Sequence, residues 1–195
     1  MIKFAVLLIL IAVLEHSKSV ALPKCNRDYK NHCTGTVIHK NGEKYIGEIK
    51  NFQYHGKGSY LFSNGNTYIG DFKNGIQDGQ GTFTYSNGDK YIGEFRNGLY
   101  HGNGLAVFSD GEKYEGEYRD DLPHGKGIQT FIAGDKYVGD FVDGIRSGYG
   151  TFTFSNGDEY VGKFKNNMFN GKGILTFVNG KIQEGLFVDH VFQND

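Results

Sequence analysis

The stretch "SNGDKYIGEF", Ser86 to Phe95, decides the fold of this chain, because near copies of it recur at a fixed spacing. "SNGNTYIGDF" begins at Ser63, "SDGEKYEGEY" at Ser109 and "SNGDEYVGKF" at Ser155, so the spacing is 23 residues or twice that number. A fixed period of this length is typical of architectures in which each repeat stacks on its neighbours. The period therefore has to be interpreted before any single residue.

The repeat covers almost the whole chain when the tyrosine of "YIGEF" is taken as position 1 of a unit. All 30 glycines then fall at positions 3, 8, 12, 14 and 21, whereas a glycine-rich linker would scatter them. Six full units are bounded by two half-units. The half-units are 31–44 and 183–195, and the full units are 45–67, 68–90, 91–113, 114–136, 137–159 and 160–182.

Two segments of each unit have the alternation of a β-strand. In "YIGEFR" (91–96) and "GTFTY" (81–85), aromatic residues or glycine alternate with polar or β-branched residues. Neither segment is long enough for a helix, and the units show no helical period. We therefore predict an all-β fold: an elongated, twisted, single-layer antiparallel sheet of successive β-hairpins with about 14 strands.

The "SNG" triplet is predicted to be the turn between strands, and two loop lengths are possible. A two-residue Asn-Gly loop would pair Tyr85 with Lys90 and send the aromatic residues to opposite faces. A three-residue loop with its glycine as a left-handed bulge gathers Phe83, Tyr91 and Phe95 on one face. The second option is favoured because the rings can then lie over the strand glycines, which gives those glycines a function.

The first 21 residues differ from the repeats and are interpreted as a signal peptide. Lys3 precedes an apolar run from Phe4 to Leu14, and small residues at Ser19 and Ala21 suit cleavage after Ala21. A retained membrane anchor is the alternative, but the run is shorter than the ~20 residues that span a bilayer. This predicts export to the periplasm, the cell envelope or the medium.

The mature N-terminus carries both cysteines of the chain. Cys25, in a short lead-in (22–30), and Cys33 are predicted to form a disulfide, because an oxidising compartment favours one. Removing Lys3, Lys18 and Glu15 leaves 19 basic and 21 acidic side chains, a net charge of −2. A nucleic-acid partner is not expected, since such proteins concentrate positive charge.

The repeat resembles that of a known family. "YIGEFRNGLYHGNGLAVF" (91–108) is similar to the MORN repeat, the likeness extends over 31–195 as a seven-fold repetition, and the exported form resembles bacterial exported members. The family's pattern is broken by Phe52, Asp121 and Asn167 at position 8, and by Asp78, Ser147 and Asn170 at position 11. The resemblance implies a scaffold, a homo-oligomerisation module or an accessory domain, with membrane-lipid binding as a further possibility.

No catalytic, cofactor or metal site is predicted. The position-4 carboxylates, such as Glu94 and Glu117, recur ~10 Å apart, beyond the spacing of paired catalytic acids, and they are part of the repeat itself. The histidines of position 11, His55, His101 and His124, would also lie ~10 Å apart or more, too far to share one zinc ion. We expect them to bond to local backbone.

Two rows of side chains leave alternatives open. The basic residues of position 6 either meet anionic lipid headgroups or pair with the position-4 carboxylates, and the negative net charge favours pairing. The aromatic residues either form an open interaction face or are satisfied by packing on the glycines. The candidate interaction face consists of Tyr45, Phe72, Phe83, Tyr91, Phe95, Tyr118, Phe141, Phe152 and Phe164.

The two end strands of the sheet have unpaired backbone groups that must be covered or used in assembly. At the first edge, the Cys25–Cys33 loop is expected to fold over the strand Thr36–His39. The last segment has neither proline nor lysine to protect it, so a homodimer is predicted through this edge. Its candidate residues are Leu186, Phe187, Val188, Val191 and Phe192.

The predicted function is that of a non-enzymatic exported repeat protein, acting as a protein-interaction, scaffold or envelope-structural module with a protein partner. Binding of phospholipid headgroups at a membrane surface is the alternative. A more distant one is an accessory subunit of a separately encoded enzyme.

Overall fold

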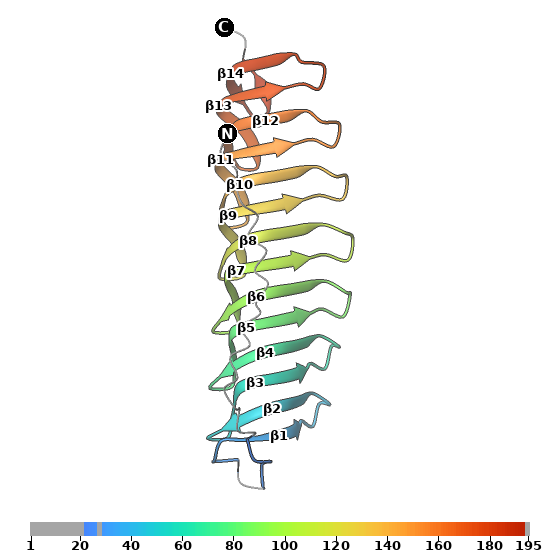
Figure 1. Cartoon of the computed structure of the whole chain (residues 1–195), viewed down its shortest axis with the longest axis vertical. Coiled ribbons are helices and arrows are strands. Elements are labelled where there is room, and N and C mark those ends of the chain that lie inside the picture. The colour runs from blue at the N-terminus through green and yellow to red at the C-terminus, as the bar shows by residue number, and fades with distance from the viewer. Residues whose placement is uncertain (1–21, 27–28, 194–195) are drawn as a thin grey trace, which may run out of the picture.

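The computed structural model describes residues 22–26 and 29–193, and the predicted signal peptide lies outside the described residues. These residues form one open antiparallel sheet in which each strand pairs with the next one in the chain. The sheet is an elongated column of stacked hairpins (Figure 1). Fifteen strands at ~4.8 Å spacing make it roughly 67 Å long. The predicted fold class is confirmed, with one short strand more than expected.

The strands alternate between seven and nine residues inside the array. Those of seven residues begin just before position 1, and those of nine residues begin at position 9. They are β1 (Cys33–Ile38), β2 (Lys44–Lys50), β3 (Gln53–Leu61), β4 (Thr67–Lys73), β5 (Ile76–Thr84), β6 (Lys90–Arg96), β7 (Leu99–Val107), β8 (Lys113–Arg119), β9 (Leu122–Thr130), β10 (Lys136–Val142), β11 (Ile145–Thr153), β12 (Glu159–Lys165), β13 (Met168–Thr176), β14 (Ile182–Val188) and β15 (Val191–Phe192).

The "SNG" turns are three-residue loops, as predicted. Tyr85 donates its N–H to Asp89 O at 2.8 Å, and Gly88 donates to Tyr85 O at 3.0 Å with a φ of 96°. The register that follows pairs Phe83 with Tyr91, so both rings lie on one face. These loops stack along one long side of the column (Figure 1). The two-residue alternative, which would pair Tyr85 with Lys90, does not occur.

The opposite long side is built from two-residue turns at positions 7 and 8. In Asn97-Gly98 both residues have positive φ, 51° and 84°. A turn of this kind requires left-handed backbone at both central positions, which is why Asn-Gly suits it. Phe52 occupies the second of these positions in the turn between β2 and β3, with a φ of 63°.

The core of each repeat is a tyrosine ring lying on two glycines. Tyr91 is 1% exposed, and its ring covers Gly93 and Gly104, which face each other across β6 and β7. Its hydroxyl donates to Glu94 O at 3.0 Å. Tyr100 stacks on the same ring with a centroid distance of 3.7 Å. The single-layer sheet thus buries its rings against its own backbone and one another.

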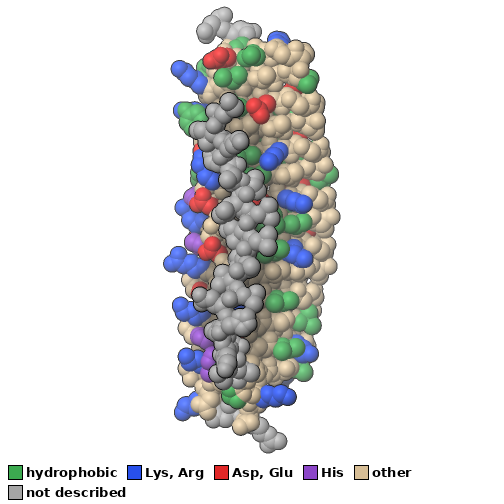
Figure 2. All heavy atoms as spheres, viewed as in Figure 1, with side chains coloured by type: hydrophobic (Ala, Val, Ile, Leu, Met, Phe, Trp, Pro, Cys, Tyr) green, Lys and Arg blue, Asp and Glu red, His purple; other side chains and the backbone are tan. Residues whose placement is uncertain are grey.

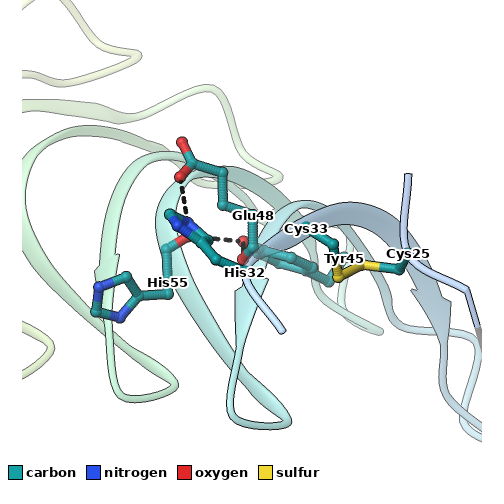
Figure 3. Close-up of a disulfide and its surroundings, with 6 residues drawn as sticks. All are labelled: Cys25, His32, Cys33, Tyr45, Glu48 and His55. Carbon is teal, nitrogen blue, oxygen red and sulfur yellow. Dashed lines mark hydrogen bonds and ion pairs between the residues drawn. A yellow bond between two sulfur atoms is a disulfide. The ribbon is translucent and has the colours of Figure 1, made fainter. Parts of the chain in front are cut away.

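The first edge is covered by the lead-in. Cys25 and Cys33 form the predicted disulfide, with a Cα–Cα distance of 5.0 Å (Figure 3). Cys25 donates its N–H to Thr34 O at 2.8 Å, and Thr34 donates to Pro23 O at 2.9 Å. The lead-in therefore pairs with the start of β1. Tyr29, in the same Cys25–Cys33 loop, lines a cavity together with Val37 and His39, in agreement with the expected position of the loop over Thr36–His39.

The last edge is partly closed by the chain itself. After β14 the chain turns back, and β15 pairs Phe192 with Phe187 and Val191 with Val188. The Phe192 ring lies over Gly185, and Phe187 is buried. Within the described residues, no helix has the length and hydropathy to cross a membrane.

Candidate functional site

The rings of the candidate interaction face belong to the core. Seven of its nine residues are 0–6% exposed, and Phe83 and Phe152 are partly buried against them. A partner has no access to such rings without opening the sheet. Of the two alternatives for these residues, the burial supports packing on the glycines. The accessible apolar surface lies elsewhere.

A long groove runs over the opposite face of the sheet. Its volume is about 2070 Å³, and it extends from β5 to β15. The glycines of positions 3 and 14, such as Gly93 and Gly104, line it with bare backbone, since their rings lie on the other side. Across ten strand spacings the groove is ~48 Å long.

Apolar side chains of positions 2 and 15 line this groove. Ile92, Val138 and Val161 are 43–45% exposed, although they are branched residues in the middle of strands. Tyr149, at position 13, is 60% exposed beside them. Hydrophobic side chains recur in this way down the column (Figure 2). The sequence carried a signal for this surface: isoleucine or valine at position 2 of five units, on the face expected to be polar.

The position-4 carboxylates have a structural function. Glu94 Oε1 accepts the N–H of Asn103 at 3.1 Å, and Glu117 Oε1 accepts that of Lys126 at 3.0 Å. The pairing of β6 with β7 and of β8 with β9, which are joined by two-residue turns, shifts between positions 3 and 5, so the carboxylate satisfies an N–H that the ladder leaves free. A set of equivalent carboxylates, each occupied in this way, does not provide an acid and a base in distinct environments.

The prediction that position-6 cations pair with these carboxylates was wrong. The lysines of position 13 take that place: Lys57 Nζ lies 2.7 Å from Asp71 Oδ1, and Lys126 pairs with Asp140. At position 6, Arg119 pairs with Asp143 instead. The other four basic residues of this position form no ion pair in the part of the chain that the structure describes. They are Lys50, Lys73, Arg96 and Lys165.

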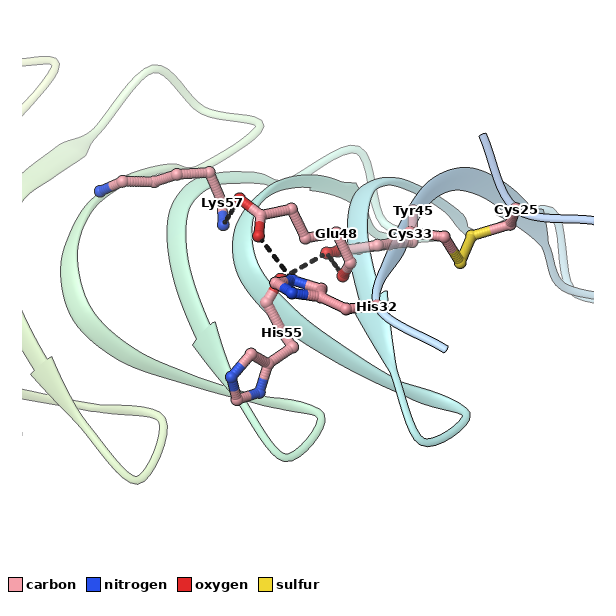
Figure 4. A network of polar contacts seen from close by, with 7 residues as sticks. All are labelled: Cys25, His32, Cys33, Tyr45, Glu48, His55 and Lys57. Atoms are coloured by element: carbon pink, nitrogen blue, oxygen red, sulfur yellow. Dashed lines mark hydrogen bonds and ion pairs between the residues drawn. A yellow bond between two sulfur atoms is a disulfide. The ribbon is translucent and has the colours of Figure 1, made fainter. Parts of the chain in front are cut away.

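The position-11 histidines do not converge on a metal site. His101 Nδ1 accepts the N–H of Gly102 at 2.8 Å, in agreement with a local backbone bond. The His55 ring is turned away from the Glu48 carboxylate, which is held by His32 at 2.9 Å (Figure 4). Among the described residues, no group of three His, Cys, Asp or Glu side chains is placed to hold a metal ion.

The solved structures that match this chain share little sequence with it. The SAS-4 (dCPAP) TCP domain of Drosophila melanogaster, in complex with a proline-rich motif of Ana2 (dSTIL), is 14% identical over 85% of this chain and 96% of that chain, with a TM-score of 0.46. The TCP10 domain of Danio rerio CPAP is 14% identical over 80% and 88%, with a TM-score of 0.26. Scores this low carry no inference about function. A search of curated proteins found no match.

The sequence profile of the MORN repeat matches the array itself. Six consecutive matches fall on 45–67, 68–90, 91–113, 114–136, 137–159 and 160–182, which are the six full units. The half-units lie outside them, so the seven-fold count is not matched, although β14 continues the pattern by pairing Gly185 with Gly173. Six matched repeats make up most of the chain, and it therefore belongs to the MORN repeat family.

Proposed function

We propose that this chain is a non-enzymatic protein-interaction module whose docking surface is the groove opposite the aromatic core. The observation that supports this most is the row of half-exposed branched residues, Ile92, Val138 and Val161, along a hollow of about 2070 Å³. An exposed apolar surface of this extent is typical of an interaction site. The fit is to an extended polypeptide segment, because the groove is long and its glycines leave the backbone accessible.

The groove test compares two valine-to-aspartate variants. Val161→Asp places a charge in the groove, and Val142→Asp places the same charge on the two-residue-turn side, where Val142 is 48% exposed. In a pull-down from the envelope fraction of the source organism, we expect a partner to be retained by Val142→Asp and lost from Val161→Asp. The reason is that binding to Val161→Asp would bury an unpaired charge in the interface, which costs free energy of binding. Equal recovery by both variants would exclude the groove as the docking surface.

Binding of phospholipid headgroups is the second candidate, and the unpaired cations of position 6 favour it. Lys73 and Arg96 lie directly across their hairpins from Ile76 and Leu99, which are 46% and 39% exposed. Basic side chains beside exposed apolar ones are suited to an anionic membrane surface. The net charge of −2 opposes this attraction.

We expect weak or no flotation of the mature protein with phosphatidylserine vesicles at ~150 mM salt, since screening weakens four scattered cations. The control is a Lys73→Gln/Arg96→Gln double variant. Flotation of the wild type that the double variant loses would establish the lipid function instead.

Export is part of the proposal. The Cys25–Cys33 disulfide supports it, because such bonds persist in oxidising compartments. Expression in a secreting host is expected to yield a mature chain that begins at Leu22, as measured by intact mass. A mass equal to the full chain in the exported fraction would contradict cleavage after Ala21.

A further inference from the structure

The first three strands of the array, β1 to β3, depart from the repeat on the core face, and a cavity opens there. The open cavity has a volume of about 350 Å³. Position 18, which carries Phe or Tyr in all six full units, is occupied here by His39, and position 16 is occupied by Val37. The wall residues are Tyr29, Val37, His39, Ile49, Phe52 and Tyr54, with Gln53 and Gly75 at the margin.

Phe52 is the least expected residue in this wall. It takes a φ of 63° in a turn where other units have glycine, asparagine, aspartate or histidine, and its side chain is 67% exposed. A bulky residue at positive φ is strained, and such strain persists mostly at clamps and binding sites. Its backbone N–H is held by Tyr29 O at 3.0 Å. Neither burial nor turn geometry explains a phenylalanine at this position.

The wall specifies an uncharged ring with one polar group. Of its residues, Tyr29, Phe52 and Tyr54 offer aromatic surface, and no described wall residue is Lys, Arg, Asp or Glu. His39 Nε2 and Tyr54 Oη are 2.6 Å apart and form a polar point within the apolar wall. A dry cavity of ~150 Å³ already holds a benzene ring, so this one has room for a substituted ring.

We propose that this cavity binds a neutral hydroxylated aromatic ring, either a free phenol or a tyrosine side chain of a peptide. The ring packs between Phe52 and the cavity wall, and its hydroxyl hydrogen-bonds to the His39–Tyr54 pair. The wall residues belong to the lead-in, to β1, β2 and β3, and to the turns beside these strands. The site therefore occurs once in the array. It is separate from the groove, and its test does not depend on the groove.

The test titrates 22–195 with p-cresol, followed by ligand-observed NMR, and compares Phe52→Gly with the control Phe108→Ala. Phe108 is also an exposed aromatic residue, at 42%, but it lies away from the cavity. We expect saturable binding with a Kd on the order of 0.1–1 mM, weakened at least fivefold by Phe52→Gly and unchanged by Phe108→Ala. Because glycine relieves the positive φ, the melting temperature of Phe52→Gly should be equal to or above that of the wild type.

Further probes distinguish the ligand class and its source. Toluene and benzoate should each bind at least fivefold more weakly than p-cresol, and equal binding would overturn the hydroxylated, neutral class. A tyrosine-containing peptide that binds more tightly than p-cresol, and loses binding on Tyr-to-Ser exchange, assigns the source to a peptide; weaker binding assigns it to a free phenol. Absence of saturable binding by every probe, or equal binding by Phe52→Gly, would overturn the proposal.

Discussion

The Gly93→Val variant is expected to lose about 3 kcal/mol or more of folding stability, whereas Glu94→Gln next to it should lose less than about 1 kcal/mol. A Cβ added at Gly93 would lie 2.6 Å from Asn103 O, 2.6 Å from Gly104 Cα and 2.7 Å from Tyr91 Oη. Two of these three atoms are backbone, so the side chain has no space to enter. The tyrosine ring would be lifted from the glycines, and β6 and β7 would separate.

Glu94→Gln is the matched control because it changes the same strand on the opposite face. An amide oxygen still accepts the N–H of Asn103, which the carboxylate holds at 3.1 Å. Thermal or chemical unfolding of the two variants measures the difference. Equal melting temperatures would show that the ring does not depend on the bare glycine backbone.

The second large effect concerns assembly through the last strand. We expect 22–195 to be a homodimer at ~100 µM, with Glu184→Pro monomeric and Glu184→Gln still dimeric. Gln193 donates its N–H to Leu186 O at 2.9 Å, so by alternation the N–H and C=O groups of Ile182 and Glu184 also face outward. Within the described residues, β15 covers only the C-terminal end of β14. Two copies can pair these free groups across a two-fold axis.

Exposed apolar side chains support this contact. Leu186, Val188 and Val191 are 50%, 43% and 62% exposed at the end of the column. Proline at 184 removes only an outward N–H, which leaves the pairing of β14 with β13 intact. Light scattering after size exclusion gives the mass of each variant. A monomeric wild type at ~100 µM, far above the Kd of a micromolar contact worth ~8 kcal/mol, would exclude this dimer.

The sequence by itself determined the architecture. Glycines in register and strand alternation set the hairpins, and the "SNG" triplet set the loop length that brings Phe83 opposite Tyr91. These features are local, because a turn and its two flanking strands lie within one unit of the chain. The disulfide could also be predicted from the sequence, because two cysteines in an oxidising compartment have few alternatives to pairing with each other.

Only the tertiary structure decided which face is open. Sequence alternation separates Tyr91 from Ile92 but does not say which side is buried; ring packing on Gly93 and Gly104 closes one face and leaves Ile92 in the groove. Charge pairing was misassigned for a similar reason: Lys57 of the preceding unit lies directly opposite Asp71 across β3 and β4, so it pairs with that carboxylate in place of a position-6 residue. Burial and ion pairs depend on contacts between units, and these contacts form only when the units stack.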